Sequence, residues 1–252
     1  MNGAKAEAAH WDGDGWAPPD DTTVFIVSGG AKGITAACVI ALAERYGCRF
    51  VLVGRSRYDE SPEPAWAENE SDERALRRRA IAHLQAQGET PDPGTVRRMA
   101  REVCSRREIA GTLREVAAAG AEAVYARADV TQERELREAV TGGLRRLGVD
   151  RVDGVIHGAG VIADRRIEEK TAEDFELVYG VKVDGFENLL RCTVPEDLKF
   201  VVLFTSVAGF YGNIGQTDYA LANAVLDKTA HQLSVRYPDC RAMCRFNATY
   251  KP

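Results

Sequence analysis

FVVLFTSVAGFYGNIGQTDYALANAVLD occupies residues 200–227 and begins with a short apolar run. A run of this length, rich in β-branched and aromatic side chains, is typical of a buried strand in a parallel sheet. It ends at Thr205 and Ser206, and open α/β sheets bind ligands at the carboxyl ends of their strands. Beyond a glycine-containing loop, a helical pattern carries Tyr219 and Asn223 four residues apart on one face. The stretch therefore predicts a hydroxyl, a phenol and an amide that face a common space.

A second strand–turn–helix pattern lies near the N-terminus. Residues 23–27 predict the first strand, SGGAKGIT at 28–35 predicts a glycine-rich turn, and residues 36–46 predict the helix that follows. Glycines allow the tight turn and the close approach of a pyrophosphate, and a helix N-terminus offers free N–H groups to that anion. We therefore predict a dinucleotide site whose contacts at this turn are Gly29, Gly30, Lys32, Gly33 and Ile34.

The end of the next strand indicates which dinucleotide binds. Residues 49–54 predict the second strand, and Arg55 and Ser56 follow it directly. An acidic residue at this position would bond a ribose 2′-hydroxyl, whereas an arginine accommodates a 2′-phosphate. Arg55 therefore favours NADPH over NADH as the cofactor. The alternative is that Arg55 is a solvated surface residue.

Residues 58–110 make the connection to the third strand unusually long. The segment is rich in Glu and Arg, and residues 71–87 and 95–115 have the composition of helices. Two interpretations remain open. The segment is either an arm that docks a partner or a second copy of the chain, or a helical excursion that faces solvent, which we favour.

The rest of the chain continues the alternation of strands and helices. We predict strands at 121–126, 152–156 and 241–246, and helices at 133–147 and 172–192. Because crossovers between parallel strands are right-handed, this order predicts an α/β doubly wound parallel sheet, the Rossmann fold, with a helical insertion after the second strand. We expect residues 1–22 to be a linker or disordered arm and residues 23–252 to form one domain.

Ser206, the Tyr219-x-x-x-Asn223 pattern and Lys182 on the preceding helix resemble the ketoreductase domains of polyketide and polyunsaturated fatty acid synthases. These domains belong to the short-chain dehydrogenase/reductase superfamily, and the resemblance covers residues 24–246. It implies NADPH-dependent reduction of a β-ketoacyl group, carried on the phosphopantetheine arm of an acyl carrier protein, to a β-hydroxyacyl group. The implied context is an iterative polyketide, enediyne-type or polyunsaturated fatty acid synthase, whose other domains are then partners.

The resemblance also implies a role for each site residue. Tyr219 is the acid that protonates the carbonyl oxygen, and Ser206 hydrogen-bonds that oxygen. Lys182 supplies an ammonium, which favours a phenolate because an opposite charge nearby stabilises it, and Asn223 orients Lys182 or an ordered water. The resemblance implies cofactor contacts from Lys182 and Tyr219 themselves and from Asp129, Val130, His157, Gly158 and Ala159.

Two departures from the family pattern are visible. Thr35 replaces the last glycine of the turn, at the point where the helix packs closely on the strand. After the sixth strand the chain reads NATYKP over residues 247–252, where the family continues into a lid helix and a final strand. We therefore expect a piece of a larger synthase or an unusually short relative. The alternative function is a catalytically silent, reductase-like scaffold domain of a synthase.

The configuration of the product depends on a third motif. Family members that form a D-hydroxy product usually carry a Leu-Asp-Asp triplet after the H-x-A-G motif. Here that position reads Ile162-Ala163-Asp164, which keeps an apolar residue and the last acid. The tryptophan of L-forming members is absent, and Phe210-Tyr211 occupies its loop. We expect a D-hydroxyacyl product.

Composition argues against several other classes of protein. The 252 residues carry a net charge of −5, which is not a nucleic-acid footprint. No apolar segment reaches the ~20 residues that a membrane span needs, and the N-terminus lacks the apolar core of a signal peptide. The six cysteines form no C-x-x-C pair, and His157 has no second ligand at metal-binding spacing. We therefore expect a cytoplasmic protein with reduced thiols, no membrane contact and no metal.

Overall fold

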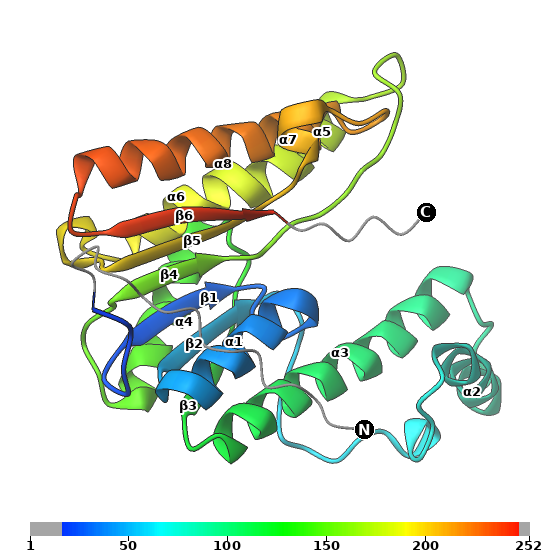
Figure 1. Ribbon diagram of the computed structural model, residues 1–252. Helices are drawn as coiled ribbons and strands as arrows, with labels where there is room; N and C mark the ends of the chain where they lie inside the picture. The colour runs from blue at the N-terminus through cyan, green and yellow to red at the C-terminus, as the bar shows by residue number, and fades with distance from the viewer. Residues whose placement is uncertain (1–16, 247–252) are drawn as a thin grey trace, which may run out of the picture.

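The computed structural model of the chain describes residues 17–246 (Figure 1). Residues 1–16 of the predicted linker and the whole NATYKP end therefore lie outside the described residues. Residues 17–22 lead directly into the first strand, and Asp20 binds the hydroxyls of Thr22 and Thr23 at 2.8 and 2.9 Å. The rest of the described chain alternates strands and helices around one sheet.

Six strands form one parallel sheet within residues 17–246, in the order β3-β2-β1-β4-β5-β6. The chain builds outward from β1 in one direction and then restarts at β4, so the order reverses between these two central strands. This topology confirms the predicted doubly wound fold, in which ligands bind at the carboxyl ends of the strands beside the reversal. The strands are β1 Val24–Ser28, β2 Arg49–Gly54, β3 Glu122–Arg127, β4 Gly154–His157, β5 Phe200–Thr205 and β6 Arg241–Phe246.

Helices cover the sheet on two faces, each with its own apolar cluster. The first face packs against α4 (Glu133–Leu147), α6 (Gly185–Arg191) and α8 (Thr217–Arg236). The second face packs against α1 (Gly33–Tyr46) and the C-terminal part of α3 (Pro93–Ala118). Side chains that bury these contacts include Leu136, Val140, Phe186, Leu189 and Leu226 on the first face, and Val39, Ala43, Ile109 and Val116 on the second.

The helix predicted over residues 172–192 is interrupted at its centre. It consists of α5 (Ala172–Tyr179), a π-helical turn over Gly180–Asp184, and α6. Gly185 sits so close to Val130 that an added Cβ would lie 2.7 Å from its Cγ2, so a glycine is needed for this close packing. A π-helical turn redirects the side chains that it carries and often occurs at functional sites. Here it carries Lys182.

The segment 58–108, which we call the arm, projects away from the sheet (Figure 1). It contains a short turn at Ala65–Ala67, α2 (Glu73–Ala86) and the first part of α3, and it has apolar clusters of its own around the half-buried Trp66. The predicted insertion boundary at residue 110 falls inside α3, because that helix continues onto the sheet, where Ile109 is fully buried. The helix predicted over residues 95–115 already crosses this boundary, so the end of the insertion falls within one continuous helix.

Two further features concern the environment of the protein. Among the described residues, no helix is both long and apolar enough to cross a membrane. All six cysteines are free thiols, and burial raises the pKa of Cys48, Cys240 and Cys244 to about 12, 11 and 12. These thiols are therefore protonated at neutral pH and act as small apolar side chains.

Candidate active site

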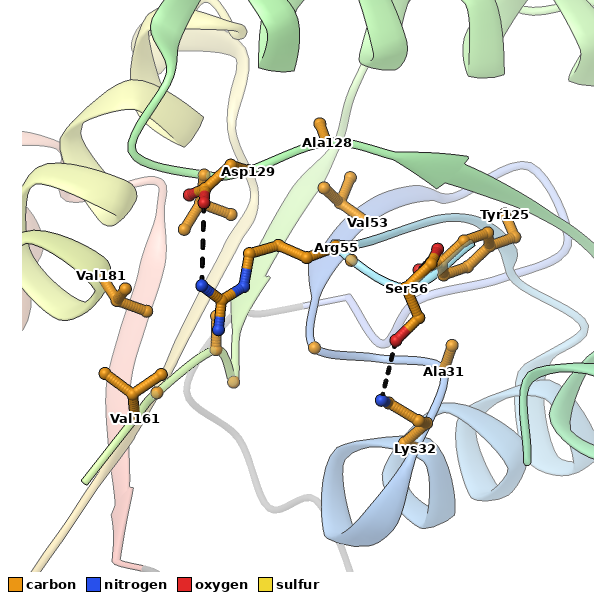
Figure 2. A pocket seen from close by; sticks show the side chains of 16 residues that line it. Ala31, Lys32, Val53, Arg55, Ser56, Tyr125, Ala128, Asp129, Val161 and Val181 are labelled. Atoms are coloured by element: carbon orange, nitrogen blue, oxygen red, sulfur yellow. Dashed lines mark hydrogen bonds and ion pairs between the residues drawn. The ribbon is translucent and has the colours of Figure 1, made fainter. Parts of the chain in front are cut away.

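A cavity of about 530 Å³ lies at the carboxyl ends of β1, β2 and β4, beside the loop that follows β3 (Figure 2). We call it the large cavity. The cavity lies at the point where the strand order reverses, between the neighbouring strands β1 and β4. Eight of the predicted cofactor residues line it: Gly29, Lys32, Arg55, Ser56, Asp129, Val130, Gly158 and Ala159.

The glycine turn owes its shape to backbone conformation rather than to side chains. Gly29 has a φ of +68°, and an added Cβ would lie 3.0 Å from the backbone nitrogen of Ala159. Gly33, with a φ of +60°, is exposed and begins α1, so the first N–H groups of that helix have no partner within the helix. Gly30 is buried, and a Cβ at this position would collide with the side chain of Val27. Glycine is therefore needed here for packing. Ile34 lies outside this cavity and lines a neighbouring one.

Two basic side chains line the large cavity, Lys32 beside Ser56 and Arg55 beside Asp129. Figure 2 shows Lys32, whose Nζ donates a hydrogen bond to Ser56 Oγ at 3.0 Å. Arg55 reaches across the cavity to Asp129, with 3.8 Å between Nη1 and Oδ2, and its side chain is 56% exposed. A pair this long and this exposed is weak and screened by salt. Arg55 is therefore free to exchange Asp129 for another anion.

His157 lies beneath the cavity and belongs to the packing of the sheet. It is fully buried at the end of β4, and its Nδ1 lies 2.7 Å from Ser28 Oγ at the end of β1. Burial, with the charge of Lys182 as a second cause, lowers the pKa of His157 to about 3. The imidazole is therefore neutral and accepts from or donates to Ser28 as a fixed cross-link between the two central strands. No group of residues suited to a metal occurs in the described part of the chain.

The Thr35 substitution is accommodated by a second glycine. Thr35 is buried, and a Cβ added to Gly158 would lie 2.2 Å from Oγ1 of Thr35. The threonine side chain therefore fills the space beside Gly158, and the helix keeps its close contact with the end of β4. The position that the family motif leaves open, the x of H-x-A-G, is glycine in this chain for that reason.

A smaller cavity of about 240 Å³ adjoins the large one and contains Lys182 and Tyr219, and we call it the tyrosine cavity. Lys182 is 4% exposed, and its Nζ donates a hydrogen bond to the backbone oxygen of Phe204 at 2.7 Å. The same Nζ lies 5.6 Å from the centre of the Tyr219 ring. Burial lowers the pKa of Lys182 to about 8. The structure thus brings together the predicted ammonium and the predicted phenol.

Ser206 and Asn223 line a different cavity of about 140 Å³, which we call the serine cavity. Ser206 is half-buried, and its Oγ accepts a hydrogen bond from the Ala208 N–H at 3.2 Å. Asn223 is buried, and its Nδ2 donates to the backbone oxygen of Tyr219 at 2.7 Å. The residue before Ser206, Thr205, is the one that lines the tyrosine cavity. The roles of Ser206 and Asn223 therefore stay predictions.

A buried ion pair that no sequence pattern indicated lies beside Tyr219. Lys170 Nζ lies 2.7 Å from Asp218 Oδ2, with side chains 7% and 1% exposed, and it also donates to the backbone oxygen of Ala163 at 2.9 Å. The other carboxylate oxygen, Asp218 Oδ1, accepts from the Tyr219 N–H at 2.8 Å. The pair fixes the start of α8 to the segment after β4. The two residues are 48 apart in the chain, and lysine and aspartate in polar surroundings give no signal of burial.

Comparisons with known proteins agree with this geometry. The profile of the KR domain family matches residues 23–238. A polyunsaturated fatty acid synthase protein of Thraustochytrium sp. is 37% identical over 227 residues, which are 88% of this chain and 8% of the relative. Polyketide synthase PksN of Bacillus subtilis is 28% identical over 86% of this chain and 3% of the relative. The chain thus spans less than a tenth of the length of these curated relatives.

The chain is also similar to solved structures of ketoreductase domains. A ketoreductase domain from the bacillaene assembly line superposes with a TM-score of 0.61 at 27% identity, over 94% of this chain and 45% of that one. A ketoreductase from the first module of phoslactomycin biosynthesis in Streptomyces has a TM-score of 0.62 at 26% identity, over 91% and 42%. With its doubly wound sheet, its glycine turn and a profile match over residues 23–238, the chain belongs to the KR domain family, the ketoreductases of the short-chain dehydrogenase/reductase type.

Proposed function

We propose that this chain reduces a β-ketoacyl group carried by an acyl carrier protein to a β-hydroxyacyl group, with NADPH as the cofactor. The observation that carries the proposal is the buried Lys182 beside Tyr219, at the edge of the large cavity. The two cavities adjoin along one edge of the sheet, because four residues line both of them: Gly29, Lys32, Gly158 and Gly160. A dinucleotide in one cavity and a proton donor in the other would therefore meet.

The large cavity has the features that a nicotinamide cofactor needs, and KR ketoreductases are nicotinamide-dependent. A Cβ on Gly29 would crowd Ala159, so this turn lets a ligand approach the backbone closely. The exposed start of α1 at Gly33 supplies N–H groups for a pyrophosphate. In this proposal Asp129 and Val130 lie beside the adenine.

The preference for NADPH rests on the two basic side chains that line the large cavity. A 2′-phosphate adds negative charge there, and Lys32 and Arg55 are its proposed partners. Arg55 is held only by a 3.8 Å pair with Asp129, so little is lost when it turns to a phosphate. Its planar guanidinium can bind phosphate oxygens with two parallel hydrogen bonds.

In the proposed mechanism the bound cofactor supplies a hydride to the carbonyl carbon of the substrate. Tyr219 donates its phenolic proton to the carbonyl oxygen. Lys182, whose pKa of about 8 keeps it charged at pH 7, stabilises the phenolate that remains. Ser206 hydrogen-bonds the same oxygen once its Oγ turns from the Ala208 N–H. Asn223 holds the helical turn that carries Tyr219 and orients Lys182 or a water.

The partners, location and product of the chain are further parts of the proposal. The relatives are named as synthases, which supports an acyl carrier protein and other synthase domains as partners. Six free thiols support a reducing, cytoplasmic environment. Ile162 lines the tyrosine cavity, and Asp164 accepts a hydrogen bond from Gln216 at 3.0 Å, so the remaining residues of the triplet border the substrate space. We keep the D-hydroxyacyl product as the expected one.

One observation favours the alternative, a silent scaffold domain. Ser206 lines the serine cavity, apart from Lys182 and Tyr219, and its hydroxyl is already bonded. A scaffold would bind its neighbours in the synthase and would need no hydroxyl near the carbonyl. The buried ammonium argues against this interpretation, because burying a charged lysine costs free energy and serves no purpose in a scaffold.

Absorbance at the nicotinamide band separates the two functions. The protein is mixed with NADPH and an acetoacetyl thioester, and the Tyr219→Phe variant is the control because it lacks only the phenolic hydroxyl. We expect oxidation of NADPH that falls by roughly a hundredfold or more in the variant, since general-acid catalysis contributes that much. Equal rates in the two proteins, at the level of the uncatalysed reaction, would support the scaffold. Chiral chromatography of the product then tests its configuration.

A further inference from the structure

The arm contacts the proposed cofactor site through the side chain of Lys32. Lys32 Nζ donates one hydrogen bond to Ser56 Oγ at 3.0 Å and a second to Ser105 Oγ at 3.1 Å. Ser56 follows β2 in the body of the fold, whereas Ser105 lies on α3 within the arm, 73 residues beyond Lys32. An ammonium has three N–H donors, so one remains for another acceptor. The arm therefore helps to fix the position of a lysine that lines the large cavity.

The helix that carries Ser105 is firmly held against the glycine turn. Thr112 Oγ1 donates a hydrogen bond to the backbone oxygen of Ala31 at 2.9 Å, in buried surroundings. Two consecutive residues of the turn, Ala31 and Lys32, thus bind α3. Ile109 and Val116 anchor the same helix in the core. A hydroxyl on a rigid helix orders its partner better than one on a loop does.

The two residues after Ser105 join the same helix to the rest of the arm. Arg107 binds both carboxylate oxygens of Glu63, at 2.7 and 2.6 Å, and the backbone oxygen of Ala67 at 2.9 Å. Arg106 lies 3.2 Å from Asp59. One turn of α3 thus contacts the cofactor turn with its first residue and the folded arm with the next two. The arm thus contributes a residue to this site, and its two interpretations, a docking element or a solvent-facing excursion, both stay predictions.

We infer that Ser105 is a specificity-determining residue for the 2′-phosphate of the cofactor, a step that rests on the proposed use of NADPH. Lysine has a flexible stem, and ordering such a side chain costs conformational entropy. Ser105 and Ser56 hold Lys32 in place before the ligand arrives, so less of this cost falls on binding. Each serine oxygen accepts from Nζ and keeps its own O–H as a donor for a phosphate oxygen.

Calorimetric titration of the protein with NADPH and with NADH tests this role without requiring turnover. We expect Ser105→Ala to weaken NADPH binding by roughly tenfold or more, the size expected for one hydrogen bond to a charged group, and to leave NADH binding unchanged. Ser105→Thr, which keeps the hydroxyl, should retain the preference of the wild type. Ser71→Ala, an exposed serine elsewhere on the arm, is the matched control and should bind both dinucleotides as the wild type does.

A double-mutant cycle with Lys32→Met distinguishes positioning from a general loosening of the fold. If Ser105 acts through Lys32, then Ser105→Ala should have no further effect on NADPH binding in the Lys32→Met background. Additive losses, or equal weakening of NADPH and NADH, would overturn the inference. If the wild type prefers NADPH and the Ser105→Ala variant keeps this preference, the role of Ser105 is overturned but the proposed cofactor is not. A wild type that binds NADH as tightly as NADPH would overturn the proposed cofactor as well.

Discussion

The proposed nucleotide half and the proposed catalytic half of the sheet edge are built in different ways. In the nucleotide half, around β1 to β3, the shape comes from backbone and glycine, and the charged side chains are accessible: Arg55 is 56% exposed. In the catalytic half, around β4 to β6, the charged side chains are buried: Lys182 is 4% exposed. Charges in the first half can adapt to a ligand, whereas those in the second half are fixed in advance. Pre-ordering suits a site that must hold a proton donor in one geometry.

This contrast predicts that stability is most sensitive in the catalytic half. Lys170→Met leaves Asp218 as a buried carboxylate without its partner, so we expect a loss of about 3–5 kcal/mol in the free energy of unfolding. Urea denaturation measures it. Arg165→Met is the matched control, because it breaks a pair of 3.3 Å in which Arg165 is 54% exposed; we expect a loss of at most about 1 kcal/mol there. Similar midpoints for the two variants would mean that burial of the Lys170–Asp218 pair does not raise the cost of losing one partner.

The strand-end hydroxyls provide the next test, because the structure places them in different cavities. Ser206→Ala should lower kcat by about a hundredfold or more, as the loss of one oxyanion donor does. Thr205→Val, which keeps the shape of a residue only 1% exposed, should lower kcat by no more than about threefold. Steady-state rates with NADPH and an acetoacetyl thioester decide between them. A reversed order would assign the hydroxyl role to the residue that lines the tyrosine cavity.

The buried lysine should make stability depend on pH. Its pKa falls from 10.5 to about 8 in the folded protein, so between these values the unfolded chain holds the proton and the folded protein does not. Free energy of unfolding should therefore rise with pH across this window, by about 3 kcal/mol in total. Lys182→Met removes the group, and its stability should lack this rise. Parallel pH profiles of the two proteins would show that Lys182 is as well solvated when folded as when unfolded.

The smallest change is expected in the relative affinity of the nucleotide half for NADPH and NADH. Arg55→Asp should lower the preference for NADPH over NADH by roughly tenfold, because a guanidinium that suits a 2′-phosphate is replaced by a repelling carboxylate. Arg55→Gln, which removes the charge without adding repulsion, should lower it less. Relative dissociation constants of the two dinucleotides measure the change. Unaltered ratios in both variants would mean that Arg55 faces solvent and that the preference depends on Lys32.

Much of the fold follows from local patterns in the chain. The predicted bounds of β2, α4 and β6 agree with the structure, because each has an unambiguous periodicity and a clear end: Gly148, for example, takes the left-handed conformation that ends α4. The helix predicted over 172–192 is also present, but its π-helical centre was not predicted. Directly after that turn Gly185 packs against Val130, a contact between residues 55 apart that no local pattern encodes.

The sequence by itself determined the order of strands and helices and the glycine turn, which follow from short-range periodicity and from the rules of parallel sheets. The pairing of Lys182 with Tyr219 was implied only by the resemblance to the family. Only the tertiary structure decided which side chains meet: Thr35 with Gly158, Lys170 with Asp218, and Ser105 with Lys32. Such pairs join residues 48 to 123 apart in sequence, and their free energy comes from burial and geometry that exist only once the chain has folded.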